Sequence, residues 1–538
     1  MELRGLPHVV VVPNGAAGHA IPFLEFIKRM AATGIVTTVV ASDKHILELE
    51  ILLGSRDLTC QGVPLRLLGL QDHMTHLSHA NWTATISNLS LKKLQIIRLL
   101  EEAVRDVGSP QSLQLRGVQP ANPPQCIVHD MFTEWAQEAA EALHIEKHLL
   151  YVSPACSLSC DLESNRLFQE CRFPITRDTR DAIISGIPGV PSIPALEYPR
   201  VFLDASSSKW MRSCHLSFRR ADAILLNTFY DLERPVLDAL RHEVMGSSDI
   251  QAKCILDIGP LLPESHFTDA TPEEIVQERD PCISWLNTRP AKSVLYVSFG
   301  SAASHSASQL VDLALGLEAS ECSFLWIVRP PDAIDRAATL NALERVAEYL
   351  PPGFEGRVKD RGMCYSGWAP QMRILKHPAI GGFLSHCGWN STLETVAAGV
   401  PVLAWPIKAE QHLIRRFLVD TLRIAVELKG DNYAELELEG DGLRPPLRVS
   451  KEEIANKIRC LMVEEESQLL QLNIQKLMVK FKEAGALGGS SRLNFEAYVS
   501  LLHANHDSAA QLKEMEHKSE MRDIFSTGER PLAIATLG

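Results

Sequence analysis

The stretch that decides the fold runs from Trp368 to Gln411 and reads WAPQMRILKHPAIGGFLSHCGWNSTLETVAAGVPVLAWPIKAEQ. Within it, Ala379–Ser385 is a short apolar run bounded by turn residues, which is typical of a buried strand. The following TLETVAAG contains helix formers and ends at Gly399, a residue type that favours the C-cap of a helix. Since Val400–Trp405 is strand-like again, the stretch predicts a βαβ unit.

The helix of this unit is expected to begin at an anion-binding site. Asn390 or Ser391 stands where an N-cap residue belongs. The free N–H groups and the positive dipole at that end of a helix attract negative charge. His386 adds an imidazole donor for the same phosphate, and Gly388 allows the backbone to approach closely. One turn into the helix, Glu394 offers a carboxylate to two ribose hydroxyls.

Both ends of the stretch carry further candidate binding residues. Trp368 offers a flat face on which a base can stack, and Glu410 with Gln411 offers a fork for sugar hydroxyls. Each feature also has a structural explanation, because a Trp is usually a core residue and a Glu–Gln pair is usually solvated. Taken jointly, the features predict a ligand in which a diphosphate joins a nucleotide to a group rich in hydroxyls.

The stretch resembles, without insertion or deletion, the signature box of the plant-type UDP-sugar glycosyltransferases, which belong to glycosyltransferase family 1. The resemblance implies a GT-B fold, in which two Rossmann-like α/β domains face each other across a cleft and a C-terminal helix returns to the first domain. It implies that Trp368 stacks the uracil and that Gln371 and Glu394 hold the ribose. By the same match the diphosphate is bound by His386, Asn390 and Ser391, the sugar is contacted by Trp389, Glu410 and Gln411, and Ala369 and Gly388 belong to the same donor site.

Length and composition limit the class of protein. A chain of 538 residues predicts two or more domains, and 46% hydrophobic with 22% charged residues is typical of a globular protein. The net charge of −13 argues against nucleic acid or an anionic membrane as the main partner.

The sequence predicts a cytoplasmic protein that is not inserted in a membrane. The apolar run Val9–Val12 is cut by Pro13 and is too short to span a bilayer, and the first residues lack the long apolar core of a signal peptide. Twelve cysteines are scattered singly, and the nearest pair, Cys156 and Cys160, has no matching second pair. We therefore expect reduced thiols and no zinc site.

The rest of the chain repeats the α/β pattern. His8–Pro13 and Ile35–Ser42 read as strands on either side of a helical stripe that runs from Phe23 to Met30. The expected organisation is an acceptor-binding N-terminal domain over 1–257, a linker over 258–281, a UDP-sugar-binding C-terminal domain over 282–487, a returning helix over 488–503 and a disordered polar tail over 504–538.

A candidate general base lies in the first domain. His19 follows the first strand and Asp130 ends the strand Cys126–Asp130, so both belong to the rim where parallel sheets bind ligands. A carboxylate behind an imidazole fixes its tautomer and stabilises its protonated form. The alternatives are that His19 only starts a helix and that Asp130 only caps one. His129 is a rival base, but neighbouring strand residues point to opposite faces.

The resemblance places His19 at the position of the family's catalytic base and Asp130 at that of its activating carboxylate, and it aims Gly300 and Ser301 at the diphosphate. It implies a single displacement with inversion, in which UDP leaves without help from a metal ion, so no cofactor is expected. The implied partners are UDP-glucose and a small lipophilic acceptor, bound by a monomer.

Two residues depart from the family's pattern. Lys408 stands where an aromatic or apolar residue is usual, and Ile414 stands where Asn is common. Lys408 either tunes the donor choice toward an acidic sugar such as glucuronate or points to solvent, and we expect the second. Gln411, the last residue of the box, favours glucose over galactose as the donor sugar within the family.

Two other functions were weighed against a transferase. A nicotinamide-dependent dehydrogenase also contains βαβ units, but Gly15-Ala16-Ala17-Gly18 lacks the spacing of a dinucleotide-binding turn. A catalytically silent homologue that binds a nucleotide sugar or a small ligand is the second alternative. The acceptor itself is not specified by the sequence, because its pocket is expected in variable loops within 74–92, 150–170 and 190–215.

Overall fold

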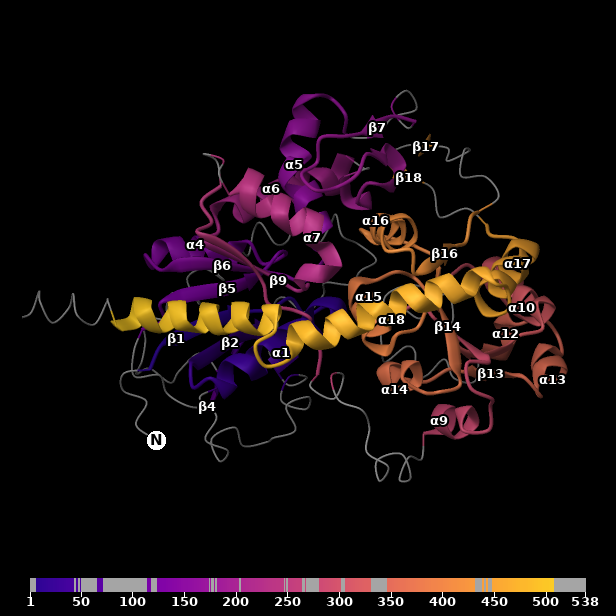
Figure 1. Cartoon of the computed structure of the whole chain (residues 1–538). Helices are drawn as coiled ribbons and strands as arrows, with labels where there is room; N and C mark the ends of the chain where they lie inside the picture. The colour runs from indigo at the N-terminus through magenta and orange to yellow at the C-terminus, as the bar shows by residue number, and fades with distance from the viewer. Residues whose placement is uncertain are drawn as a thin grey trace, which may run out of the picture.

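The computed structural model describes residues 6–42, 45–46, 49, 65–70, 114–117, 123–173, 175, 179, 181–202, 205–245, 247, 250–263, 267, 280–300, 305–329, 346–430, 438–439, 442–443 and 448–507. These residues form two α/β domains, each built around its own sheet (Figure 1). Ser301, the loop 74–92, most of the expected linker and residues 508–538 of the expected tail lie outside the described residues.

The N-terminal domain contains an eight-stranded sheet in the order β10-β9-β6-β5-β1-β2-β3-β4. Its strands are β1 (His8–Val12), β2 (Val36–Ser42), β3 (Leu65–Leu70), β4 (Gln114–Gly117), β5 (Cys126–Asp130), β6 (Glu146–Tyr151), β9 (Ala223–Leu226) and β10 (Cys254–Asp257). All pairs are parallel except β3 with β4. Val12 pairs with His129, so β1 and β5 end side by side.

The C-terminal domain contains a six-stranded parallel sheet in the order β13-β12-β11-β14-β15-β16. Its strands are β11 (Val294–Ser298), β12 (Ser323–Ile327), β13 (Gly362–Tyr365), β14 (Ile380–Ser385), β15 (Val402–Ala404) and β16 (Ala425–Glu427). Because the strands are parallel, the loops that follow β12, β11, β14 and β15 all leave the sheet at one edge.

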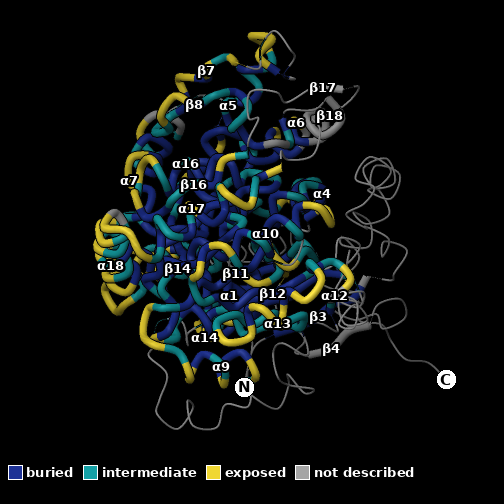
Figure 2. Tube along the Cα trace, turned by 90° about the vertical axis from the view of Figure 1, so that its right-hand side faces the viewer, coloured by how far each residue is buried: buried dark blue, intermediate teal, exposed yellow. Residues whose placement is uncertain are grey.

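Helices cover both sheets, so that the strands lie in the buried interior and the exposed residues lie on the outer helices and turns (Figure 2). In the N-terminal domain these are α1 (Ala17–Ala32), α4 (Trp135–Ala142), α5 (Ala155–Gln169), α6 (Ala205–Arg220) and α7 (Tyr230–Ala239). In the C-terminal domain they are α9 (Pro281–Leu286), α10 (Ala307–Ser320), α12 (Val346–Tyr349), α13 (Phe354–Val358), α14 (Gln371–Leu375), α15 (Trp389–Ala398), α16 (Gln411–Arg416), α17 (Lys451–Met462) and α18 (Glu466–Gly485).

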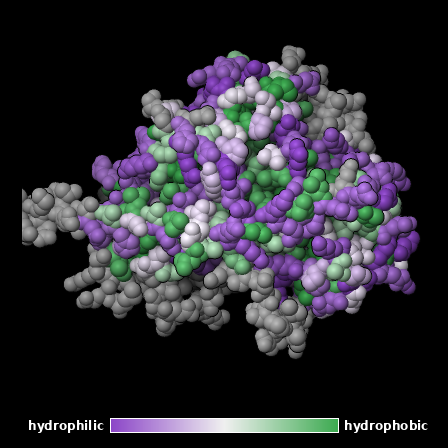
Figure 3. Space-filling view, in the orientation of Figure 1, coloured by the Kyte–Doolittle hydropathy of each residue, from purple (hydrophilic) through white to green (hydrophobic). Residues whose placement is uncertain are grey.

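Besides the short 3₁₀ segment η2 (Arg200–Phe202), three π or 3₁₀ segments and two short hairpins are present among the described residues. They are η1 (Ala195–Glu197), η3 (Leu240–Val244), η6 (Phe417–Thr421), β7 (Ile183–Ile184) with β8 (Ile193–Pro194), and β17 (Leu438–Glu439) with β18 (Gly442–Leu443). The surface shown in Figure 3 mixes hydrophilic and hydrophobic residues, and α18, which crosses this face, leaves Leu469, Leu472 and Val479 exposed.

The two domains share apolar core. One buried cluster contains Phe229 and Leu232 of the N-terminal domain together with Trp389 and Leu393 of α15 and Phe481 of α18. Burial of such side chains is worth about 1.5–3 kcal/mol each, so this cluster holds the domains against each other behind the helix of the signature stretch.

The chain returns to the N-terminal domain at its end. The helix over residues 490–507 runs from α18 across to the first sheet (Figure 1, yellow). Its Tyr498 and Leu502 are fully buried in an N-terminal core cluster, and Gln125 Nε2 donates to the carbonyl of Leu502 at 2.9 Å. The expected returning helix is confirmed, with a C-terminal end beyond residue 503.

The βαβ unit is confirmed within the signature stretch, but its helix begins differently. Gly399 ends α15 in the left-handed conformation, with φ of 68°. The N-cap is Gly388, not Asn390 or Ser391, and no side chain caps the helix. The prediction was wrong because both polar side chains have other partners: Ser391 Oγ accepts a bond from Gln371, and the Asn390 amide donates to Gly18.

Candidate active site between the two domains

His19 and Asp130 form a hydrogen-bonded pair at the rim of the first sheet. His19 lies in the first turn of α1, shortly after β1, and Asp130 ends the neighbouring β5. His19 Nδ1 lies 2.8 Å from Asp130 Oδ2, and the two side chains are 17% and 0% exposed. The carboxylate accepts a hydrogen bond from Nδ1–H, so that Nε2 of the neutral ring keeps a free lone pair.

Two further hydrogen bonds hold Asp130 in place beside His19. Its Oδ1 accepts the backbone N–H of Phe132 at 2.9 Å, and its own N–H donates to Thr133 Oγ1 at 3.0 Å. The turn after β5 therefore fixes the direction of the carboxylate, and the carboxylate in turn fixes the imidazole.

The environment makes His19 a stronger base. Burial on its own lowers the pKa of His19, but the charge of Asp130, the hydrogen bond to Asp130 and the charge of Glu410 outweigh it, so the pKa is raised above 6.5. A raised pKa strengthens proton uptake by the ring, which is what a general base requires.

The rival histidine is turned away from the rim. His129 is fully buried, and its Nδ1 lies 2.9 Å from the carbonyl oxygen of Asp130. Burial lowers the pKa of His129 to about 4, so this ring is a neutral core residue.

Across from His19, the second sheet presents His386 between two glycines. A Cβ on Gly388 would lie 2.4 Å from His386 Nε2, and a Cβ on Gly300 would lie 2.7 Å from the same atom. Gly300 also has φ of 71°, a conformation that L side chains rarely adopt. Both glycines are therefore required by the position of this imidazole.

His386 is a neutral donor. Its Nδ1 is buried with no hydrogen-bond partner in the described part of the chain. Burial, and secondarily the charges of Lys408 and Arg329, lower the pKa of His386 to about 4. The ring can donate a hydrogen bond to a phosphate but does not carry a positive charge near neutral pH.

Gln371 and Glu394 meet beside the first turn of α15. Gln371 Nε2 donates to Glu394 Oε2 at 2.6 Å and to Ser391 Oγ at 3.0 Å, and Gln371 Oε1 accepts from Tyr296 at 3.3 Å. Burial raises the pKa of Glu394 to about 7. The arrangement presents an amide and a carboxyl group together, as recognition of a vicinal diol requires.

Trp368 lies at the outer end of this group, with 55% of its surface exposed, and the adjacent Ala369 is half-buried. An aromatic face this exposed is accessible for stacking a planar base.

Trp389 and Asn390 bind the other domain. The indole N–H of Trp389 donates to the carbonyl of Asn227 at 2.7 Å, and the ring is buried, with 4% exposed. Asn390 Nδ2 donates to the carbonyl of Gly18 at 2.9 Å. The indole N–H of Trp389 is therefore used in the domain interface, and contact of Trp389 with the donor sugar stays a prediction.

Glu410 and Gln411 stand on a tight turn after β15. Gln411 Oε1 accepts the backbone N–H groups of Ile407 at 3.0 Å and Lys408 at 2.9 Å. Because Oε1 of Gln411 faces the backbone of the turn, the amide nitrogen Nε2 of the same side chain is directed away from it. Glu410 Oε1 accepts a hydrogen bond from Ser153 of the N-terminal domain at 3.0 Å.

Both residues that depart from the family's pattern are placed by the structure. Lys408 is half-buried, and the direction of its ammonium group stays a prediction. Burial lowers the pKa of Lys408, and the nearby charge of Glu410 opposes that. Ile414 is fully buried in the cluster shared by the two domains, so it serves packing.

Three contributors were missed by reading the sequence. Arg329 follows β12 at the same sheet edge as His386, and the rule that ligands bind beyond strand ends points to it. Ser153 follows β6 in the same way. Asn227 contributes only a backbone carbonyl to Trp389, which no residue pattern reveals.

No helix among the described residues is long and apolar enough to cross a membrane, and no group of three or more His, Cys, Asp and Glu side chains within the described ranges could hold a metal ion.

Comparison with known proteins gives one consistent match. Residues 259–429 match the family model described as UDP-glucoronosyl and UDP-glucosyl transferase. UDP-glycosyltransferase 72B1 of Arabidopsis thaliana is 32% identical over 90% of this chain and 93% of its own length.

Solved structures with a similar fold give the same result as the sequence comparisons. The fold is similar to that of TcCGT1 in complex with UDP, with a TM-score of 0.74, 27% identity, and coverage of 93% of this chain and 100% of that one. It is also similar to UGT2 of Phytolacca americana complexed with UDP-2fluoro-glucose and pterostilbene, with a TM-score of 0.71, 25% identity, and coverage of 92% and 99%.

Proposed function

The chain belongs to the plant-type UDP-glycosyltransferases, and we propose that it transfers glucose from UDP-glucose to a hydroxyl of a small lipophilic acceptor, with inversion at the anomeric carbon. The observation that carries the proposal is the His19–Asp130 pair, at 2.8 Å, on the rim of the first sheet. The bond from Asn390 to Gly18, next to His19, joins this rim to the C-terminal domain at 2.9 Å.

In the proposed reaction, His19 Nε2 takes the proton of the acceptor hydroxyl while its oxygen attacks the anomeric carbon. The bond from that carbon to the diphosphate oxygen breaks, and UDP leaves with the electron pair. The N-terminal N–H groups of α15 and the imidazole of His386 donate to the departing oxygens. Asp130 stabilises the imidazolium that is left on His19.

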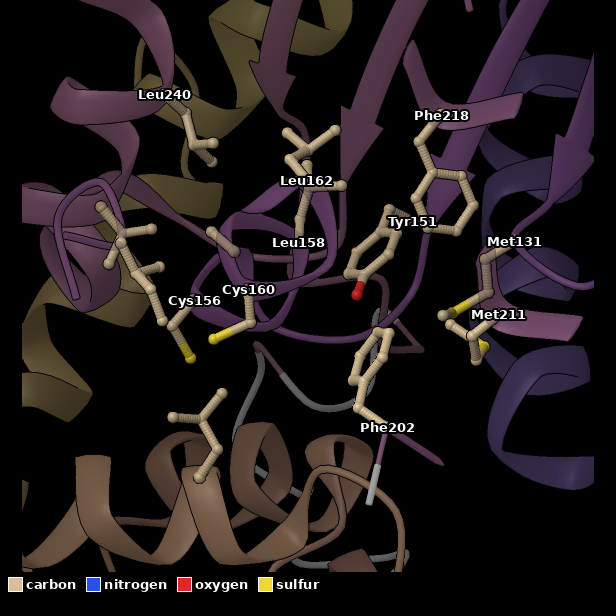
Figure 4. Close-up of a cluster of buried hydrophobic side chains, with 14 of the residues drawn as sticks. Met131, Tyr151, Cys156, Leu158, Cys160, Leu162, Phe202, Met211, Phe218 and Leu240 are labelled. Atoms are coloured by element: carbon tan, nitrogen blue, oxygen red, sulfur yellow. The ribbon is translucent and has the colours of Figure 1, made fainter. Parts of the chain in front are cut away.

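The surroundings of His19 favour an aromatic acceptor. The ring of Phe132 lies 5.0 Å from that of His19, centroid to centroid. Met131 and Met211 belong to the adjoining apolar cluster, which also contains Tyr151 and Phe202 (Figure 4). Methionine and aromatic side chains pack well against flat rings. UGT2 of Phytolacca americana, one of the similar structures, was solved with pterostilbene, which supports a phenolic acceptor.

Measuring UDP release with a panel of phenols tests the proposal. We expect wild-type protein to release UDP from UDP-glucose only when an acceptor is present. A catalytically silent homologue would give the same acceptor-independent background for wild type and for His19→Ala, and that result would reject the transferase.

A chelator is expected to leave the rate unchanged. We propose that the charge of the leaving diphosphate is met by the protein's own donors at α15 and by the nearby cations Lys408 and Arg329, both of which act on His386. Initial rates with monophenol acceptors should therefore agree within about twofold with and without excess EDTA, because the protein's own donors stabilise the leaving group. A large loss that added Mg²⁺ restores would contradict this expectation.

One observation favours a second donor, UDP-glucuronate. Lys408 is half-buried. Its charge acts on His386, which is predicted to bind the diphosphate, and the charge of Glu410, which is predicted to contact the sugar, acts on Lys408. A cation at that place would complement the carboxylate of a uronic acid.

Replacement of Lys408 by Met distinguishes the two donors. If glucuronate is the donor, kcat/KM for UDP-glucuronate should fall about tenfold, the equivalent of one ion pair of about 1.4 kcal/mol, with little change for UDP-glucose. Lys480→Met is the matched control, because Lys480 pairs with Glu483 on α18. Equal changes for both donors would exclude a role of Lys408 in donor choice.

A further inference from the structure

Contacts from the N-terminal domain hold the turn that carries Glu410 and Gln411. We propose that Ser153 and Glu197 are positioning residues for donor-sugar recognition, so that the acceptor-binding domain sets the geometry of the sugar site in the other domain. This inference rests on the proposed function, because it assumes that Glu410 and Gln411 contact the donor sugar.

The first contact is direct. Ser153 Oγ donates to Glu410 Oε1 at 3.0 Å across the domain interface, and Ser153 is buried, with 7% exposed. A hydrogen bond to a charged acceptor in a buried place is stronger than a neutral one. Because Oε1 of Glu410 accepts this bond, Oε2 remains to accept a hydrogen bond from a sugar hydroxyl.

Ser153 is itself fixed in place. It stands between β6 and α5, and the first two N–H groups of α5, of Ala155 and Cys156, donate to the carboxylate of Glu233 at 2.8 and 2.9 Å. Glu233 is fully buried. The loop after β6 is therefore tied to α7 of the same domain, and a shift of Ser153 would require these bonds to break.

The second contact holds the helix that follows the turn. Glu197 in η1 binds two arginines of α16: its Oε1 lies 2.8 Å from Arg415 Nη2, and its Oε2 lies 3.1 Å from Arg416 Nη1. Arg415 also pairs with Glu427 of β16 at 3.0 Å. Arg415 is only 4% exposed, so this bridge between the domains is shielded from solvent.

Apolar packing supports the same attachment. Leu413 of α16 is buried, with 3% exposed, and belongs to the core cluster of the N-terminal domain. The turn before α16 is internally rigid, because Gln411 Oε1 accepts two of its backbone N–H groups. The turn that follows β15 is therefore also held from the N-terminal domain, through α16.

The test compares binding of UDP with binding of UDP-glucose by calorimetry. Ser153→Ala should raise the Kd and KM of UDP-glucose about 3- to 10-fold, the effect of losing one buried hydrogen bond, while the Kd of UDP stays within about twofold. Ser153→Thr keeps the hydroxyl and should restore wild-type binding. Glu197→Gln should give the same selective loss.

Two matched controls stay within the N-terminal domain. Ser217 donates to the carbonyl of Cys214, and Glu141 pairs with Arg220 at 3.4 Å, so Ser217→Ala and Glu141→Gln should bind both ligands as wild type does. The inference is overturned if Ser153→Ala and Glu197→Gln weaken UDP and UDP-glucose equally, or change neither, in protein whose thermal melting is intact.

The outcome also separates this inference from the proposed function. If wild-type protein binds UDP-glucose more tightly than UDP and the variants preserve that difference, the positioning role fails and the transferase stands. The proposed function itself fails if wild-type protein binds UDP and UDP-glucose with the same Kd and releases no UDP from UDP-glucose with any acceptor.

Discussion

Replacing His19 by alanine is expected to lower kcat about 10³-fold, within the range of 10²–10⁴ that general base catalysis contributes. The acceptor hydroxyl would then have to lose its proton to water. The Kd of UDP-glucose should stay within about twofold, because His19 lies in the N-terminal domain and the predicted donor contacts of the C-terminal domain remain. Initial rates and calorimetry on the same protein preparation measure both quantities.

The pH dependence of kcat/KM identifies the base independently of how far kcat falls in His19→Ala. The pKa of His19 is raised above 6.5, chiefly by Asp130 against the opposing effect of burial. Because the base must be unprotonated, kcat/KM should fall as the pH falls through that raised value and should be constant above it. Asp130→Asn removes the charge, so the acid limb should move to lower pH while the plateau drops.

A matched histidine provides the control for this experiment. His377 is bonded to Asn287 on the C-terminal domain at 3.0 Å, away from the rim that carries His19. His377→Ala should keep the wild-type rate and profile. If His19→Ala and Asp130→Asn kept the wild-type acid limb, the base would have to be another group.

Local patterns predicted the parts of the site that depend on local structure. The apolar run before His386, the helix formers after it and Gly399 give the βαβ unit, because each element needs only its own residues to form. His19 and Asp130 could be brought together because the ends of parallel strands share one edge of a sheet.

Contacts between the domains could not be predicted in this way. Ser153 and Glu410 are 257 positions apart in the chain, and no periodicity relates them. The wrong N-cap has the same cause: Asn390 is a good capping residue locally, but the carbonyl of Gly18, 372 positions away, takes its amide. Long-range partners overrode local preference at each of these positions.

Replacing His386 by alanine is the second large effect that we expect. The imidazole is held between Gly300 and Gly388 at the start of α15, where the diphosphate of the donor is predicted to lie. Loss of one preorganised donor to a developing anion typically costs about 10²–10³ in kcat. The rate should fall by that factor, and UDP should bind more weakly as well, because the same donor serves the bound product.

The pH dependence separates this loss from that of the base. Burial, with the charges of Lys408 and Arg329, holds the pKa of His386 at about 4, so the ring stays neutral throughout the range in which His19 titrates. His386→Ala should therefore lower kcat/KM, which reports titration of the free protein, at every pH and leave the midpoint of the acid limb where wild type has it. His386→Asn, which retains a donor of similar reach, should recover part of the rate. A shift of the acid limb in His386→Ala would show that His386 titrates during turnover, and the assignment of that limb to His19 would then be wrong.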